Sequence, residues 1–408
     1  YSPTEILPLT NFLISKDNAM KQSTQAFDPN ITYQKRPNNA EHIKLFVSPY
    51  QYIQGKGVIN EIGEYISLCV SGSVGILITP GRERALGTVL EKSLGSVGLS
   101  SIKTIFQGES SLLEVERVIA CFQKPGMPIN VIIGVGGGKC LDTARMAASK
   151  LNIPVVTVPT TASTDAPTAA HSVVYDEDGV FDRVEFSTIS PLLVLVDLDI
   201  VANAPPRYLI AGMGDAYSTY FEARCCMENP DALTARGARP TMAALAIARQ
   251  CRDVLLEYGV EALQELKSGC IGSAFSRIVE ANILLSGIGF ESGGLAGAHA
   301  VAQGLTVCGD LHKNCLHGEL VAIGVMSQLI MEKRMEDAKD TAIFFRAVGL
   351  PLHLEQLGFD PIKRNAELDE IVRRSLEVPF MKYEPFEVTH NLLKSAIIEA
   401  GLLGKGKL

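Results

Sequence analysis

The sequence lacks the features that mark nucleic-acid-binding, membrane-spanning or disulfide-rich proteins. It has no tryptophan, and only 6% of its 408 residues are aromatic. No Lys/Arg run stands out, and 37 basic against 45 acidic residues give a net charge of −8, so we expect no nucleic-acid partner. No apolar stretch approaches the ~18 residues of a membrane span, since even the run 242–248 is followed by Arg249 and Gln250. We therefore expect a soluble protein with no membrane partner.

The nine cysteines are scattered, apart from the adjacent Cys225 and Cys226, and form no CxxC pair. Most lie in apolar runs, as Cys69, Cys251 and Cys308 do, so we expect buried, reduced thiols in a reducing compartment. The chain begins with Tyr1 rather than Met. We expect an intracellular protein of the cytoplasm or, after loss of a presequence, of the mitochondrial matrix.

Hydrophobic residues make up 47% of the chain, enough to fill about two cores of ordinary size. Residues 1–44 are rich in Asn, Gln, Ser, Thr and Pro without a clear period, and we expect them to form a loose extension. Residues 45–205 alternate short β-branched runs with helical patterns, which predicts an α/β domain with a parallel sheet covered by helices on both faces. The strands are expected over 74–79, 101–106, 130–135, 154–159 and 191–196, and the intervening helices over 82–94, 112–122 and 140–151.

Two further segments complete the expected organisation. Residues 171–189 interrupt the alternation and predict a β-hairpin with the acidic turn 176–179. After Pro205 and Pro206 the β-branched runs disappear, and a period near 3.6 residues predicts an all-helical domain over 206–408. Its clearest helices are expected over 240–258, 275–285, 320–337 and 340–348. Small-molecule sites commonly form in the cleft between two domains, so we expect the functional site there.

A glycine-rich turn follows the predicted strand at 130–135. Gly136, Gly137 and Gly138 are followed by Lys139 and a helical pattern, so backbone N–H groups can approach a diphosphate at a helix N-terminus. The stretch matches neither the P-loop nor the G-x-G-x-x-G template. A tight strand-to-helix turn is the alternative, and the three glycines with a lysine favour phosphate binding.

A second polar segment follows the strand at 154–159. Thr160, Thr161, Ser163, Thr164 and Asp165 lie at its carboxyl end, the edge at which open parallel sheets bind ligands. These hydroxyls and the carboxylate suit a polyhydroxylated ligand. An ordinary Ser/Thr loop with Asp165 as a helix cap is equally compatible with this segment.

Histidine is scarce, yet three of the seven, His299, His312 and His317, lie within 299–317. His299 lies in an apolar helical stretch, and His317 lies near the start of another. Asp215 follows glycines where the helical half opens. Two histidines and a carboxylate form a typical catalytic metal site. By spacing alone, hydrogen-bonded core histidines and an N-cap aspartate are the simpler interpretation.

These segments together resemble the glycerol dehydrogenase branch of the iron-containing (type III) alcohol dehydrogenase family. The resemblance runs from about Leu45 to beyond Val388, in order and in register. The segments that carry it are 48–49, 52–56, 134–143, 163–167, 193–197, 204–216, 287–299 and 317–319.

The resemblance implies a dehydroquinate synthase-like architecture with one zinc ion per chain on Asp215, His299 and His317. It implies NAD in the interdomain cleft, with contacts from the glycine-rich turn and from four other positions. It also implies an octamer or other even homo-oligomer. Asp165 corresponds to the residue that meets the substrate hydroxyls. The implied cofactor contacts are Gly136, Gly137, Gly138, Lys139, Cys140, Thr160, Thr161, Ser163 and Tyr175.

The implied reaction is the NAD-dependent oxidation of glycerol to dihydroxyacetone. A divalent metal lowers the pKa of a hydroxyl that it coordinates, so that the alkoxide can give hydride to the nicotinamide. The alternatives are a dehydrogenase of another diol or polyol, a polyol phosphate enzyme, a related NAD- and zinc-dependent lyase, and a catalytically silent homo-oligomeric scaffold.

Two positions depart from the family pattern. Thr79, Pro80 and Gly81 stand where family members usually have an acidic residue that binds the adenosine ribose, and Arg82 or Arg84 offers a partner for a 2′-phosphate. We nevertheless predict NAD rather than NADP. His171 also replaces a more usual leucine, and we assign it no role.

Overall fold

The computed structural model describes residues 27–33, 43–123, 126–176, 179 and 181–407. The expected loose extension over 1–44 lies mostly outside these residues. Within it, helix α1 spans Pro29–Tyr33, and Lys44 forms a β-bridge with Arg239. Part of the expected acidic turn at 176–179 also lies outside the described residues.

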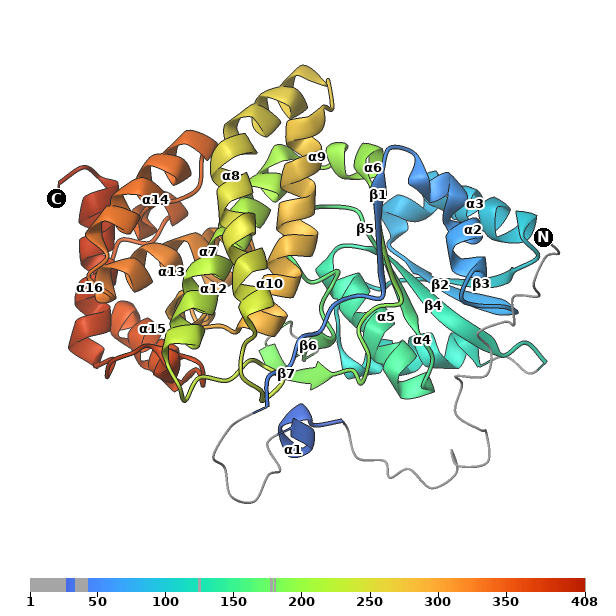
Figure 1. Cartoon of the computed structure of the whole chain (residues 1–408), viewed down its shortest axis with the longest axis horizontal. Helices are drawn as coiled ribbons and strands as arrows, with labels where there is room; N and C mark the ends of the chain where they lie inside the picture. Colours follow the sequence, from blue (N-terminus) through green and yellow to red (C-terminus); the bar gives the residue numbers. More distant parts are fainter. Residues whose placement is uncertain (1–26, 34–42, 124–125, 177–178, 180, 408) are drawn as a thin grey trace, which may run out of the picture.

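A six-stranded parallel sheet forms the first half of the molecule (Figure 1), in the order β1-β8-β5-β4-β2-β3. Its strands are β1 (Gln51–Gly55), β2 (Ser73–Ile78), β3 (Ser100–Ile105), β4 (Ile129–Gly136), β5 (Val155–Pro159) and β8 (Leu193–Asp197). The hairpin is also confirmed, with β6 (His171–Tyr175) antiparallel to β7 (Phe181–Phe186). β1 was not predicted, because its sequence, Gln-Tyr-Ile-Gln-Gly, has no apolar run.

Helices cover both faces of the sheet because side chains alternate along each strand. On one face Ile76 and Ile78 pack with α2 (Ile62–Ser67) and α3 (Pro80–Ser96). On the other face Leu77 packs with α4 (Leu112–Phe122) and α5 (Gly138–Leu151). The predicted α/β class is therefore confirmed.

The second half is helical, as predicted. After α6 (Leu198–Ala202) its helices are α7 (Pro206–Glu228), α8 (Met242–Ser268), α9 (Ser273–Glu280), α10 (Ser286–Gly293), α11 (Gly297–Leu305), α12 (Gly309–Asn314), α13 (His317–Met331), α14 (Met335–Val348), α15 (Asn365–Glu377) and α16 (His390–Gly404). A π-helical segment, η4 (Ala281–Leu285), joins α9 to α10, and short turns η3 (Val58–Glu61), η5 (Leu354–Leu357) and η6 (Met381–Tyr383) complete the elements. The helical core includes Val194 and Val196 of β8, so the two halves share apolar packing at this strand.

Two details differ from the predictions. The helix expected over 320–337 is broken between α13 and α14, because Lys333 adopts a positive φ of 58° that a helix cannot contain. All nine cysteines are free, as expected, but Cys69 and Cys270 are exposed rather than buried. No helix in the described part of the chain is long and apolar enough to cross a membrane.

Candidate active site

Three potential metal ligands from three helices meet in the helical half. Asp215 lies on α7, His299 on α11, and His317 is the first residue of α13. Asp215 Oδ1 lies 3.3 Å from Nε2 of both His299 and His317, and one ligand atom from each residue falls within 4.8 Å of the others. The His317 side chain is 48% exposed, so the group opens to solvent on that side.

Glycines allow the three helices to approach so closely. A Cβ on Gly318 of α13 would lie 1.7 Å from the Ala211 carbonyl oxygen of α7. A Cβ on Gly324, farther along α13, would lie 2.0 Å from the Ala298 carbonyl oxygen of α11. Because no side chain separates these backbones, α13 packs directly on both α7 and α11.

Asp215 lies inside α7 rather than at its start, so the N-cap interpretation is wrong: α7 begins at Pro206, directly after Pro205. Asp215 is buried, and neither of its carboxylate oxygens has a hydrogen-bond partner among the described residues. Burial by itself raises the pKa of Asp215, but the charges and contacts of His317 and His299 lower it below its ordinary value. A buried carboxylate without a hydrogen bond, whose Oδ1 lies 3.3 Å from two imidazole nitrogens, is a donor set that fits a divalent metal ion.

His299 is held from its other side by a residue that the sequence did not single out. Its Nδ1 lies 2.6 Å from Oε2 of Glu222, a fully buried carboxylate on α7. Burial lowers the pKa of His299, but the charge of Glu222 and contacts with Asp215 outweigh it and raise the pKa well above its ordinary value. Glu222 follows Asp215 by seven residues, two helical turns, and this spacing is the signal that could have identified it.

Asp165 lies in the loop after β5, near this group. Its Oδ2 accepts a hydrogen bond of 2.7 Å from the Ser286 hydroxyl, and no helix begins after it, so the helix-cap interpretation is wrong. Burial, and secondly the charge of Asp215, raises the pKa of Asp165 well above its ordinary value.

The glycine-rich turn lies at the carboxyl end of β4, where α5 begins. A Cβ on Gly137 would meet nothing within 4 Å, and one on Gly138 only the Ala166 Cβ at 3.9 Å, so the backbone here borders open space. Gly136 differs, because its Cβ would lie 2.7 Å from Thr79 Cγ2. The open backbone at the N-terminus of α5 is a geometry suited to an anion.

The remaining predicted cofactor residues surround this turn in different ways. Lys139 Nζ lies 2.7 Å from Glu109 Oε2 and 4.7 Å from the centre of the Tyr175 ring. Burial, with the charges of Asp142 and Glu109, raises the pKa of Tyr175 to about 12. Cys140 is buried with its Sγ against backbone carbonyls of β2 and β4, and its N–H donates to Gly137, so its polar groups are directed into the fold.

The hydroxyl loop is anchored to the turn through its backbone. Thr160 is buried and its N–H donates to the Gly136 carbonyl at 3.0 Å, while the Thr161 and Ser163 hydroxyls lie 3.2 Å apart. Arg145 of α5, fully buried, donates to the carbonyls of Ala166 and His171. α5, the loop and the hairpin are thus tied together by a residue that the sequence did not single out.

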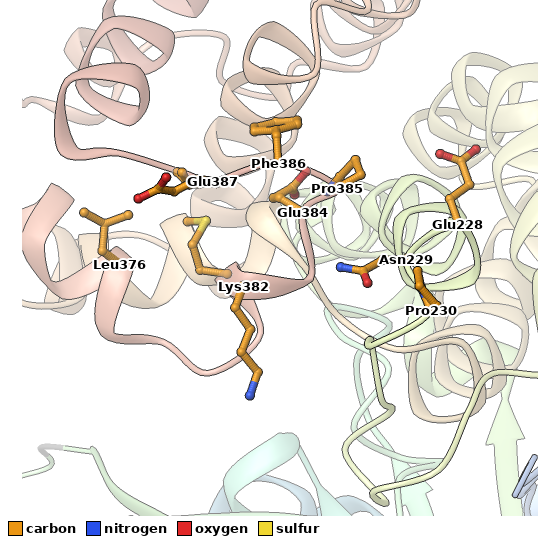
Figure 2. Close-up of a pocket in the computed structure, with 11 residues that line it drawn as sticks. Glu228, Asn229, Pro230, Leu376, Lys382, Glu384, Pro385, Phe386 and Glu387 are labelled. Carbon is orange, nitrogen blue, oxygen red and sulfur yellow. The ribbon is translucent and has the colours of Figure 1, made fainter. Parts of the chain in front are cut away.

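A separate pocket of about 710 Å³ lies beside η6 and the end of α7 (Figure 2). None of the predicted site residues lines it. Its wall includes Glu384, which with Cys225 and Glu332 forms a second group of potential ligand atoms. Arg224 and Arg334 already pair with Glu332, so we assign no metal to this group.

Comparison with known proteins gives consistent results. The family model for iron-containing alcohol dehydrogenases matches residues 53–205. A glycerol dehydrogenase of Thermotoga maritima is 44% identical over 321 residues, covering 78% of this chain and 86% of that protein. A glycolaldehyde reductase of Halobacterium salinarum is 35% identical and covers 88% and 98%. The crystal structure of glycerol dehydrogenase from Schizosaccharomyces pombe superposes with a TM-score of 0.84 at 33% identity, covering 89% of this chain and 92% of that one.

Proposed function

The chain belongs to the glycerol dehydrogenase branch of the iron-containing alcohol dehydrogenase family, and we propose that it oxidises glycerol to dihydroxyacetone with NAD and one zinc ion per chain. One observation carries this proposal: His299 and His317 converge on the buried carboxylate of Asp215, whose two oxygens have no hydrogen-bond partner among the described residues. Asp215 contributes a buried negative charge, and the histidines contribute neutral nitrogen ligands. When bound there, a divalent cation lowers the pKa of a substrate hydroxyl and favours loss of its proton.

The other residues of the site supply binding and orientation. We assign substrate binding to Asp165, which lies at the edge of the sheet and is fixed by Ser286. A carboxylate there accepts hydrogen bonds from the glycerol hydroxyls, which orients C2 for hydride transfer.

We assign the NAD pyrophosphate to the open backbone at Gly137 and Gly138, where the N-terminus of α5 favours an anion. We assign further cofactor contacts to the other predicted residues around the turn, Thr160, Thr161, Ser163, Tyr175 and the ammonium group of Lys139. We also assign Cys140 to the cofactor site, where it borders the turn with its Sγ against backbone carbonyls of β2 and β4. We further propose an even homo-oligomer, an octamer, as the functional form.

Reduction of a small 2-hydroxyaldehyde is the second candidate, because the glycolaldehyde reductase is also similar over most of both chains. The same metal and Asp165 would hold the vicinal oxygens of either substrate. Steady-state kinetics with glycerol and NAD, and with glycolaldehyde and NADH, discriminates between them.

The proposal is tested on the purified protein with glycerol and NAD. We expect NADH formation that a chelator abolishes and added zinc restores. Turnover that survives complete removal of divalent metal would refute the role of the metal, and absence of turnover with metal and NAD present would refute the substrate.

A further inference from the structure

The N-terminus of α11, which carries His299, is closed by side chains from other elements. Its cap residue, Ala296, has no side-chain acceptor of its own. Three side chains accept its first N–H groups instead: Glu222 from Ala296 and His299 at 2.8 and 2.9 Å, Glu384 from Gly297 at 2.9 Å, and Gln328 from Ala298 at 2.9 Å. These bonds satisfy donors that a helix start leaves unpaired, and they fix where α11 begins.

Glu222 differs from the other two acceptors because it also contacts the His299 ring. Oε1 accepts the two backbone N–H groups, and Oε2 lies 2.6 Å from Nδ1 of His299. A carboxylate that already accepts two backbone N–H groups can also accept the Nδ1–H of His299 at this distance. The remaining nitrogen, Nε2, then faces Asp215 and His317.

We propose that Glu222 is a positioning residue that fixes the orientation and tautomer of His299, so that Nε2 is presented to the metal. This inference rests on the proposed metal site. Asp215 and Glu222 lie two turns apart on the same helix, so one rigid element provides both a ligand and the support of a second ligand. Loss of a carboxylate that supports a ligating histidine typically weakens metal binding by about 10- to 100-fold.

The test compares Glu222→Gln and Glu222→Ala with the control Glu384→Gln. The control changes a carboxylate that caps the same helix but has no hydrogen bond to the His299 ring. Zinc affinity is measured by competition with a chromophoric chelator, alongside the thermal midpoint of each metal-free protein. We expect zinc affinity about 10-fold weaker for Glu222→Gln, up to about 100-fold weaker for Glu222→Ala, and near wild type for Glu384→Gln.

A second readout keeps the inference falsifiable if Glu222→Ala does not fold. In the zinc-loaded wild type, the Nδ1 proton of His299 should give a slowly exchanging NMR resonance, assigned by its loss in His299→Asn. In Glu222→Gln it should shift and exchange faster.

Each outcome decides one issue. Unchanged zinc affinity and resonance in Glu222→Gln, or an equal loss of affinity in Glu384→Gln, would show that Glu222 only caps the helix. Failure of the wild-type protein to bind any divalent metal would instead refute the proposed function, and this inference with it.

Discussion

Replacing Asp165 by Asn separates substrate recognition from metal binding. Asp165 is buried, and its Oδ2 accepts from the Ser286 hydroxyl at 2.7 Å. Asn keeps the size of the side chain and one oxygen for Ser286, but it replaces the other acceptor with an N–H donor. The fold and the three metal ligands should therefore be preserved.

The expected loss follows from the charge of the missing acceptor. Burial is the main cause of the raised pKa of Asp165, and the charge of Asp215 adds to it. A divalent cation bound at Asp215 would offset this second contribution and shift Asp165 toward its ionised form. A hydrogen bond to a charged group contributes about 1.5–3 kcal/mol, which corresponds to a roughly 10- to 100-fold loss in kcat/KM for glycerol.

The assay is steady-state glycerol oxidation with zinc content measured on the same samples. Ser286→Ala is the matched control, because it removes the donor and leaves the carboxylate, so its loss in kcat/KM should be smaller. Loss of zinc in Asp165→Asn would make Asp165 a ligand and refute our assignment, and an unchanged kcat/KM would show that it does not contact substrate.

Two further predictions concern the coenzyme and the helix packing. We expect kcat/KM for NAD to exceed that for NADP and Arg82→Ala to preserve this preference; a clear NADP preference that Arg82→Ala abolishes would contradict it. Gly318→Ala places a Cβ 1.7 Å from the Ala211 carbonyl oxygen, so it should cost about 1–3 kcal/mol of stability and weaken zinc binding, measured by thermal unfolding and chelator competition. Gly309→Ala, where a Cβ meets nothing within 4 Å, is the control that should change neither quantity.

The sequence predicted the elements with strong local patterns. β4 and β5 are apolar runs bounded by glycine or proline, and both lie within a residue or two of their expected bounds. β1 was not predicted, because its strand conformation depends on pairing with β8, which lies far along the chain. The break at Lys333 was also missed, since the apolar pattern continues across it.

The candidate site was also predictable only in part, because some of its residues are recognised only by the contacts that they make after folding. Asp215, His299 and His317 were identified by residue type and by resemblance, but the glycines before Asp215 suggested a helix start, whereas Asp215 lies inside α7. Glu222 and Arg145 act through contacts made after folding, with His299 and with two loop carbonyls. Only the spacing of seven residues from Asp215 could have pointed to Glu222, and nothing local marks Arg145.

The central claim is that Asp215, His299 and His317 hold one catalytic metal ion. The most direct test is the divalent metal content of the purified protein and of His317→Ala, measured by elemental analysis together with NAD-linked glycerol oxidation. His317 is half exposed at the start of α13, so its replacement should leave the fold intact. We predict one zinc ion per chain in the wild type, and loss of both the metal and nearly all activity in the variant. Retention of one zinc per chain with normal turnover in His317→Ala would contradict the account.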